Sequence, residues 1–173
     1  MKSDDYTIEF SKLVQGLNSL CFAVDDKFLS DFEFSPTKTA DTQANLELLK
    51  SDNMLDLKFN LDGTAHCTCD ICLDEFEVPI EDSFSLLIKF TEDNNNLDDQ
   101  EIIYLNRKEH QYNISQFLYE SFLLSIPSKK SCELANKEHN IEVMKKLEKT
   151  NEEIQNQSND PRWDKLKDLY TNN

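Results

Sequence analysis

The clearest pattern along the chain is an alternation of apolar and polar residues that leads into a cysteine-rich stretch. In residues 54–61, MLDLKFNL, every second residue from Leu55 to Leu61 is apolar, as expected for a strand with one buried face. The next two residues, Asp62-Gly63, are typical of a hairpin turn. The pattern therefore predicts a β-hairpin whose second strand contains the cysteines.

The length of the predicted loop decides which way those cysteines point. A two-residue loop at Asp62-Gly63 would place Cys67 and Cys69 on the polar face of the hairpin. A three-residue loop, residues 61–63, puts its glycine at the left-handed position that such loops favour. Because a one-residue slip turns every side chain to the opposite face, the apolar pattern favours the three-residue loop. We therefore predict that both cysteines face inward.

Several other segments have the composition of strands. They are YTIEF (6–10), LCFAVDD (20–26), ANLELLK (44–50), EFEVPI (75–80), SFSLLIKF (83–90) and IIYL (102–105). The first two flank a turn that contains Gly16, and Glu81-Asp82 is the expected turn between EFEVPI and SFSLLIKF.

Two segments have helical spacing instead. Asn113 can cap a helix whose apolar face includes Phe117 and Phe122, and Pro127 ends the segment, so we predict a helix at about 113–124. A second helix is predicted at about 160–171, where Pro161 takes the first helical position. Its apolar face consists of Trp163, Leu166, Leu169 and Tyr170.

These elements predict an α+β fold. A curved antiparallel sheet of about six strands carries both helices on one side, and the sequence leaves open whether the sheet closes into a barrel. We expect residues 1–127 to form the α+β domain, 128–158 a charged helical or partly disordered linker, and 159–173 a C-terminal amphipathic helix.

Charge narrows the classes of partner. The 173 residues include 18 Lys and Arg against 34 Asp and Glu, a formal net charge of -16. Such a surface repels nucleic acid and suits basic partners such as ribosomal proteins. The N-terminal residues lack the apolar core of a signal peptide, and no apolar run is long enough for a membrane helix. With five cysteines, an odd number, we expect a cytoplasmic protein without membrane contact.

Cys69 and Cys72 have the Cys-x-x-Cys spacing of half a zinc site. A structural zinc ion needs four ligands, usually two such pairs, and the sequence has no second pair. The remaining candidates are isolated or adjacent residues: Cys21, His66, Cys67, His110, Cys132 and His139. A local site of His66, Cys67, Cys69 and Cys72 is disfavoured, because strand alternation points His66 away from Cys67. The ligand count therefore argues against a metal.

The same cysteines fit redox chemistry even less well. A redox Cys-x-x-Cys usually begins a helix, whereas LDEFEVPI after Cys72 is strand-like and acidic, which raises thiol pKa values. The simplest interpretation makes Cys67 and Cys69 small core residues and places Cys72 in a turn. The three histidines are scattered, and two glycines exclude phosphate-binding loops, so we expect no catalytic residue, no cofactor and no enzyme.

Three blocks in order give the chain a family resemblance. They are DGTAHCTCDICLDEF, with Cys69, Cys72 and Leu73; the segment from the acidic loop to LLSIP, with Glu120 and Pro127; and DPRWDKLKDL, with Asp160, Pro161 and Trp163. In these blocks the chain resembles the bacterial YceD family (DUF177) of large ribosomal RNA accumulation proteins. It departs from the family at Ile71, where relatives have arginine, and after Pro127, where many have a second cysteine pair and this chain has only Cys132. Metal binding is therefore not carried over.

The resemblance implies a role in synthesis, processing or stability of 23S rRNA during assembly of the large ribosomal subunit, without a catalytic residue. The acidity of the chain suggests that a large-subunit precursor is bound through a basic ribosomal protein or another assembly factor, with little direct RNA contact. The candidate contact elements are the acidic loop from Glu92 to Glu101 and the predicted helix with Trp163. The alternative is a small zinc-binding interaction module that uses Cys69 and Cys72.

Overall fold

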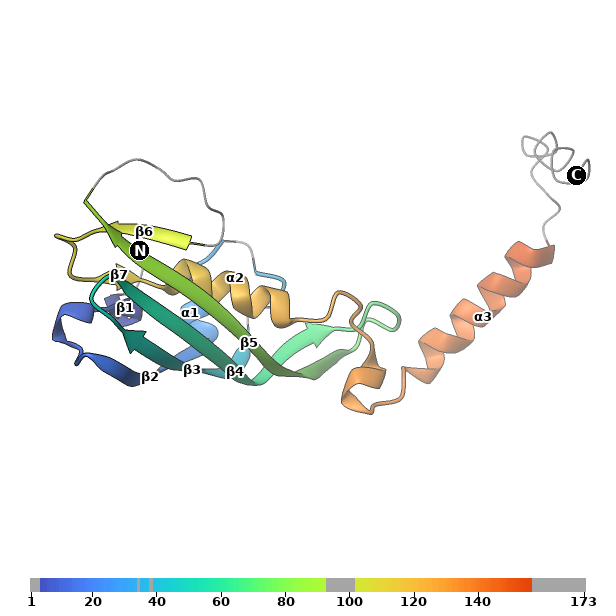
Figure 1. Cartoon of the computed structure of the whole chain (residues 1–173). Coiled ribbons are helices and arrows are strands. Elements are labelled where there is room, and N and C mark those ends of the chain that lie inside the picture. The colour runs from blue at the N-terminus through green and yellow to red at the C-terminus, as the bar shows by residue number, and fades with distance from the viewer. Residues whose placement is uncertain (1–3, 34, 38, 93–101, 157–173) are drawn as a thin grey trace, which may run out of the picture.

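A five-stranded sheet forms the body of the protein (Figure 1). The computed structural model describes residues 4–33, 35–37, 39–92 and 102–156. The strands lie in the order β2 (Gly16–Asp25), β3 (Ala40–Lys50), β4 (Met54–Thr68), β5 (Glu75–Thr91) and β6 (Ile102–Asn106). A separate two-stranded sheet pairs β1 (Thr7–Ile8) with β7 (Tyr112–Asn113).

The α+β class is confirmed, but the sheet is mixed rather than antiparallel. Neighbours from β2 to β5 follow one another along the chain and pair antiparallel, whereas β6 pairs with β5 in parallel. In the described part of the chain β2 and β6 are the two edges, so the sheet is open and does not close into a barrel.

The predicted turn at Asp62-Gly63 is wrong, because β4 runs through it without a break. Gly63 pairs with Thr42 of β3 and with Ile80 of β5. Its φ is +154°, and a Cβ at this position would overlap the carbonyl oxygen of Asp41. The glycine therefore serves a close approach of two strands instead of a turn.

The predicted turn at Glu81-Asp82 is also wrong, since β5 is continuous from Glu75 to Thr91. The inward orientation of Cys67 and Cys69 is nevertheless confirmed, because both side chains are buried. A three-residue loop and an uninterrupted strand place the same odd-numbered residues on the inner face, so the orientation did not depend on the turn.

The predicted helix at 113–124 is confirmed as α2 (Ser115–Ser125), which covers one face of the sheet (Figure 1). The Asn113 side chain accepts a hydrogen bond from the backbone N–H of Ser115 at 3.0 Å. Phe117 of α2 lies against Phe59 of β4, with ring centroids 5.2 Å apart. The main apolar core is built between this helix, the shorter α1 (Asp26–Ser30) and the inner face of the sheet.

Residues after α2 form the 3-10 helix η3 (Cys132–Ala135) and the helix α3 (Ile141–Asn156). Figure 1 shows α3 extending away from the sheet. The predicted helix at 160–171 lies outside the described residues, as does the acidic loop beyond Glu92. No helix in the described ranges is both long enough and apolar enough to span a membrane.

Candidate metal centre

The turn between β4 and β5 holds two thiols in a fixed arrangement. The backbone N–H of Cys69 donates to the carbonyl of Asp74 at 2.9 Å, and the N–H of Leu73 donates back to the carbonyl of Cys69 at 3.0 Å. Leu73 has a φ of +64°, which reverses the chain. The N–H of Ile71 points at the Cys69 sulfur, at 3.4 Å. This tight turn therefore places Cys69 and Cys72 together at the tip of the hairpin.

A second segment docks on this turn from far along the sequence. The backbone N–H of Asp70 donates to the carbonyl of Lys130 at 2.7 Å, and the N–H of Lys130 donates to the Asp70 carboxylate at 2.7 Å. The Ser131 hydroxyl caps η3, and Asn136, in the left-handed conformation with a φ of +53°, ends it and turns the chain back. Cys132 and His139 lie on the two sides of this turn.

Four potential ligands meet where the two segments touch. The ligand atoms of Cys69, Cys72, Cys132 and His139 all lie within 4.8 Å of one another. The sulfurs of Cys72 and Cys132 are 3.4 Å apart, and the Cys69 sulfur is 3.6 Å from Nδ1 of His139. These separations exceed a disulfide bond of about 2 Å, and all five cysteines are free.

The surroundings of the thiols favour negative charge at two of them. Burial raises the pKa of the Cys69 thiol, but hydrogen bonds from the backbone N–H groups of Cys72 and Ile71 outweigh it and leave the pKa lowered. For Cys72, the backbone N–H of Asn140 is the largest influence and lowers the pKa. Burial and the neighbouring thiols raise the pKa of Cys132 to about 12. Three thiols this close cannot all ionise without a cation between them.

His139 has a carboxylate behind it. Its Nδ1 faces the Cys69 sulfur, while its Nε2 lies 3.8 Å from the Glu133 carboxylate. The Asn140 side chain, next along the chain, donates to the Asp74 carboxylate at 3.4 Å. A carboxylate on the outer nitrogen of a histidine orients the ring and makes the inner nitrogen a better metal ligand.

Sequence reasoning missed this grouping although it named all four residues among the candidates. Cys132 and His139 are seven positions apart, too far for a familiar ligand pair. They are brought together by the 3-10 turn and the left-handed Asn136, which leave little trace in a hydrophobic pattern. One signal in the sequence could have indicated the pair: the segment CELANKEH (132–139) has a cysteine and a histidine at its ends and the turn-forming Asn136 between them.

Other cysteines and histidines lie apart from this group. Cys67 is buried two residues before Cys69, burial raises its pKa, and it is not among the four clustered residues. His66 is exposed, as strand alternation predicted, and its Nε2 lies 3.3 Å from the Glu77 carboxylate. His110 and Cys21 are exposed elsewhere on the surface.

The remaining family residues are spread over the molecule. Leu73 is 72% exposed at the tip of the hairpin. Glu120 lies on the exposed side of α2 and accepts a hydrogen bond from the Gln116 side chain at 2.6 Å. Pro127 directly follows α2. Asp160, Pro161 and Trp163 lie outside the described residues, and their roles stay predictions.

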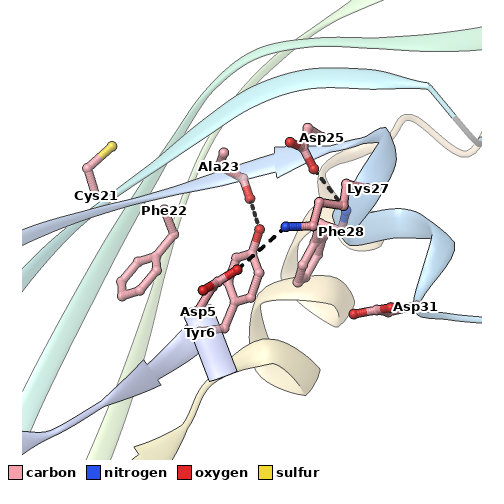
Figure 2. A pocket seen from close by; sticks show the side chains of 9 residues that line it. All are labelled: Asp5, Tyr6, Cys21, Phe22, Ala23, Asp25, Lys27, Phe28 and Asp31. Atoms are coloured by element: carbon pink, nitrogen blue, oxygen red, sulfur yellow. Dashed lines mark hydrogen bonds and ion pairs between the residues drawn. The ribbon is translucent and has the colours of Figure 1, made fainter. Parts of the chain in front are cut away.

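A separate pocket of about 300 Å³ lies between β2, α1 and the N-terminal segment (Figure 2). Figure 2 shows the Tyr6 and Phe28 rings close together, and their centroids are 4.5 Å apart. The Tyr6 hydroxyl donates to the carbonyl of Ala23 at 2.6 Å. Burial, with smaller contributions from Asp25 and Asp5, raises the pKa of Tyr6 to about 12.

The lining of this pocket carries more negative than positive charge. Its charged side chains are Asp5, Asp25, Asp31 and Lys27. Lys27 lies 3.6 Å from the Asp5 carboxylate, and the Asp25 carboxylate accepts from the backbone N–H of Phe28. Aromatic rings beside carboxylates favour cations over anions.

Comparison with known proteins gives one match. The family model described as "Large ribosomal RNA subunit accumulation protein YceD" matches residues 57–170, well over half of the chain. The matched range begins within β4 and includes β5, α2 and all four clustered residues. No curated protein and no solved structure matches the chain significantly.

Proposed function

The chain belongs to the YceD family of large ribosomal RNA subunit accumulation proteins, and from this membership we propose that it acts as a non-enzymatic factor in assembly of the large ribosomal subunit. In this role it supports the synthesis, processing or stability of 23S rRNA in the cytoplasm. The family match over residues 57–170 is the observation that carries the proposal. The clustered cysteines and histidine support a structural role, because four protein ligands leave no open position for a substrate.

The proposed direct partner is a basic ribosomal protein or another assembly factor. On the sheet face opposite α2, the exposed acidic residues of β3, β4 and β5 are Asp41, Glu47, Asp62, Glu75, Glu77 and Glu81. Lys58 is the exposed lysine on the same three strands. This charge balance favours a cationic protein surface over the phosphate backbone of RNA.

Two of these acidic residues are direct neighbours, which strengthens the case for a cationic partner. Asp62 of β4 pairs with Glu81 of β5, and both side chains are exposed. Like charges directly opposite each other on neighbouring strands destabilise a sheet. A basic side chain of a partner would relieve that repulsion, and the pocket beside Tyr6 offers a second place for one.

The first test is the ratio of large- to small-subunit ribosomal RNA in cells depleted of the protein. We expect the ratio to fall and to be restored by the wild-type chain. An unchanged ratio would contradict the proposed function. Sedimentation of the tagged chain with large-subunit precursors would then locate the step at which it acts.

The second test addresses the partner. The double variant Asp62→Lys, Glu81→Lys reverses charge at the paired site, and we expect it to release the protein from precursors. Asp52→Lys, Glu109→Lys changes net charge equally at exposed positions outside the acidic face, and it should remain bound. Equal retention of both variants would argue against the acidic face as the contact.

The alternative function is a zinc-binding interaction module, favoured by the clustering of the four potential ligands. Depletion of the protein distinguishes the two functions. A module unconnected with ribosomes would leave the ribosomal RNA ratio unchanged on depletion, whatever its metal content.

A further inference from the structure

We propose that Cys69, Cys72, Cys132 and His139 bind one zinc ion, and that this ion fastens the start of α3 to the tip of the β4–β5 hairpin. The proposal concerns this chain's own ligand set, in which a histidine completes the site where a second cysteine pair is lacking. It does not depend on the proposed ribosomal function.

The distances agree with a tetrahedral ion. Zinc lies about 2.3 Å from a cysteine sulfur and about 2.0 Å from a histidine nitrogen, so two sulfurs at tetrahedral corners are about 3.8 Å apart and a sulfur–nitrogen pair about 3.5 Å. The sulfurs of Cys72 and Cys132 are 3.4 Å apart, and the Cys69 sulfur and His139 Nδ1 are 3.6 Å apart. The other ligand-atom separations are at most 4.8 Å, so binding the ion would need shifts of about 1 Å or less.

The chemistry of the ligands selects the metal. Three sulfurs and one imidazole nitrogen form a soft set that disfavours magnesium and calcium, which prefer oxygen. The three cysteines are buried and the His139 side chain is 13% exposed, so water has little access to the site. Four protein ligands around a shielded centre are typical of structural zinc.

The backbone is already arranged for sulfurs that carry negative charge. The N–H of Ile71 points at the Cys69 sulfur at 3.4 Å, and the N–H of Asn140 points at the Cys72 sulfur. Glu133 stands behind His139. These contacts come from both segments and support Cys69, Cys72 and His139.

The ion would add a further link between two parts of the chain that the Asp70–Lys130 and Asn140–Asp74 hydrogen bonds already hold in contact. Cys69 and Cys72 belong to the hairpin, whereas Cys132 and His139 belong to the segment that leads into α3. The Asn140 side chain accepts from the N–H of Glu142 at 3.1 Å and so begins α3 directly after the ligand His139. Since α3 extends away from the sheet, its direction is set at this first turn (Figure 1).

The experiment measures zinc in the purified full-length chain by mass spectrometry of the native protein, with a chelator titration to give the affinity. We expect one zinc ion per chain. Cobalt added to the metal-free chain should show the visible absorption of tetrahedral thiolate-bound Co²⁺. Absence of both from the chain purified with its thiols reduced would overturn the proposal.

Variants then test the ligand assignment. His139→Ala should weaken zinc binding by more than about 100-fold, beyond the 10- to 100-fold typical of groups that only support a ligand. His139→Cys should restore binding by supplying a fourth thiolate. His110→Ala and Cys21→Ser, at exposed positions outside the cluster, should bind like the wild type. Unchanged affinity in His139→Ala would overturn the assignment of the fourth ligand.

Hydrogen exchange tests the role of the ion and needs no variant. Removing zinc from the wild-type chain should speed amide exchange in the first turn of α3 and in η3, while the inner strands β3 and β4 keep their protection. Restoring zinc should reverse the change. Equal exchange of α3 with and without zinc would overturn the proposed fastening.

Discussion

The two ends of the long β4–β5 hairpin are held together by different means. At one end, large apolar residues such as Phe59, Leu57 and Ile88 are buried in the core beneath α2. At the other, the buried cluster consists of Phe76, Val78 and four cysteines, with smaller contacts from Val143 and Ala135. The first end buries many large apolar side chains, whereas the second buries few, so the proposed zinc ion would contribute more to its stability. The comparison therefore predicts that the two ends respond differently to the same treatments.

The largest effect is expected from a cavity at the apolar end. Phe59→Ala removes a ring that is 1% exposed and lies against Phe117. We expect a loss of about 3–5 kcal/mol in the free energy of unfolding, measured by chemical denaturation. The loss should be the same with and without a zinc chelator, because the cavity lies in the other cluster. A loss that disappears in chelator would show that the apolar end does not stay folded without the ion.

The close approach at Gly63 gives the next effect. Gly63→Ala would push a Cβ into the backbone of Asp41 and Thr42, and its φ of +154° disfavours any side chain. We expect a loss of about 2–4 kcal/mol, from strain and displacement of β3. Gly16→Ala is the control, since φ is +96° but no atom lies within 4 Å, and it should cost about 1 kcal/mol. Equal losses would mean that backbone conformation, and not strand contact, requires the glycine at position 63.

Gly63 also shows how far the sequence predicts this fold. Strand alternation correctly predicts the buried face of β4, because apolar burial is a local property of a strand. It cannot tell a turn glycine from a glycine beneath a neighbouring backbone, because the second depends on β3, some 20 residues away in sequence. The strand β6 was predicted, but its parallel direction was not, since strand direction is set by the tertiary path and not by composition.

In the candidate site, too, one part could be predicted from the sequence and the other could not. Cys69 and Cys72 are recognisable from their spacing, because both lie on one turn. Cys132 and His139 reach them through the Asp70–Lys130 hydrogen bonds and the left-handed Asn136, neither of which a hydrophobic pattern encodes. Sequence reasoning can therefore name the ligands but not assemble them.

Tyr6, on the apolar end, gives a pH-dependent effect of intermediate size. Its pKa is about 10 in the unfolded chain and is raised to about 12 in the folded protein. As pH rises, the tyrosine therefore ionises at a lower pH in the unfolded chain than in the folded protein. The stability that Tyr6 contributes is therefore present below pH 10 and lost as pH rises toward 12. We expect the wild type to lose about 1 kcal/mol more than Tyr6→Phe between pH 9 and pH 11. Parallel unfolding curves at both pH values would contradict the raised pKa.

The smallest effect is expected at the cysteine end, where Glu133 stands behind His139. Glu133→Gln keeps the shape but removes the charge 3.8 Å from His139 Nε2. Because the Glu133 side chain is 77% exposed, we expect zinc affinity to fall by less than about tenfold, the lower limit for such supporting groups. Chelator competition measures the change, and Glu138→Gln, at a neighbouring exposed carboxylate, is the control. The unfolding of the sheet should stay unchanged in both variants. A fall in affinity as large as that of His139→Ala would contradict the purely supporting role of Glu133.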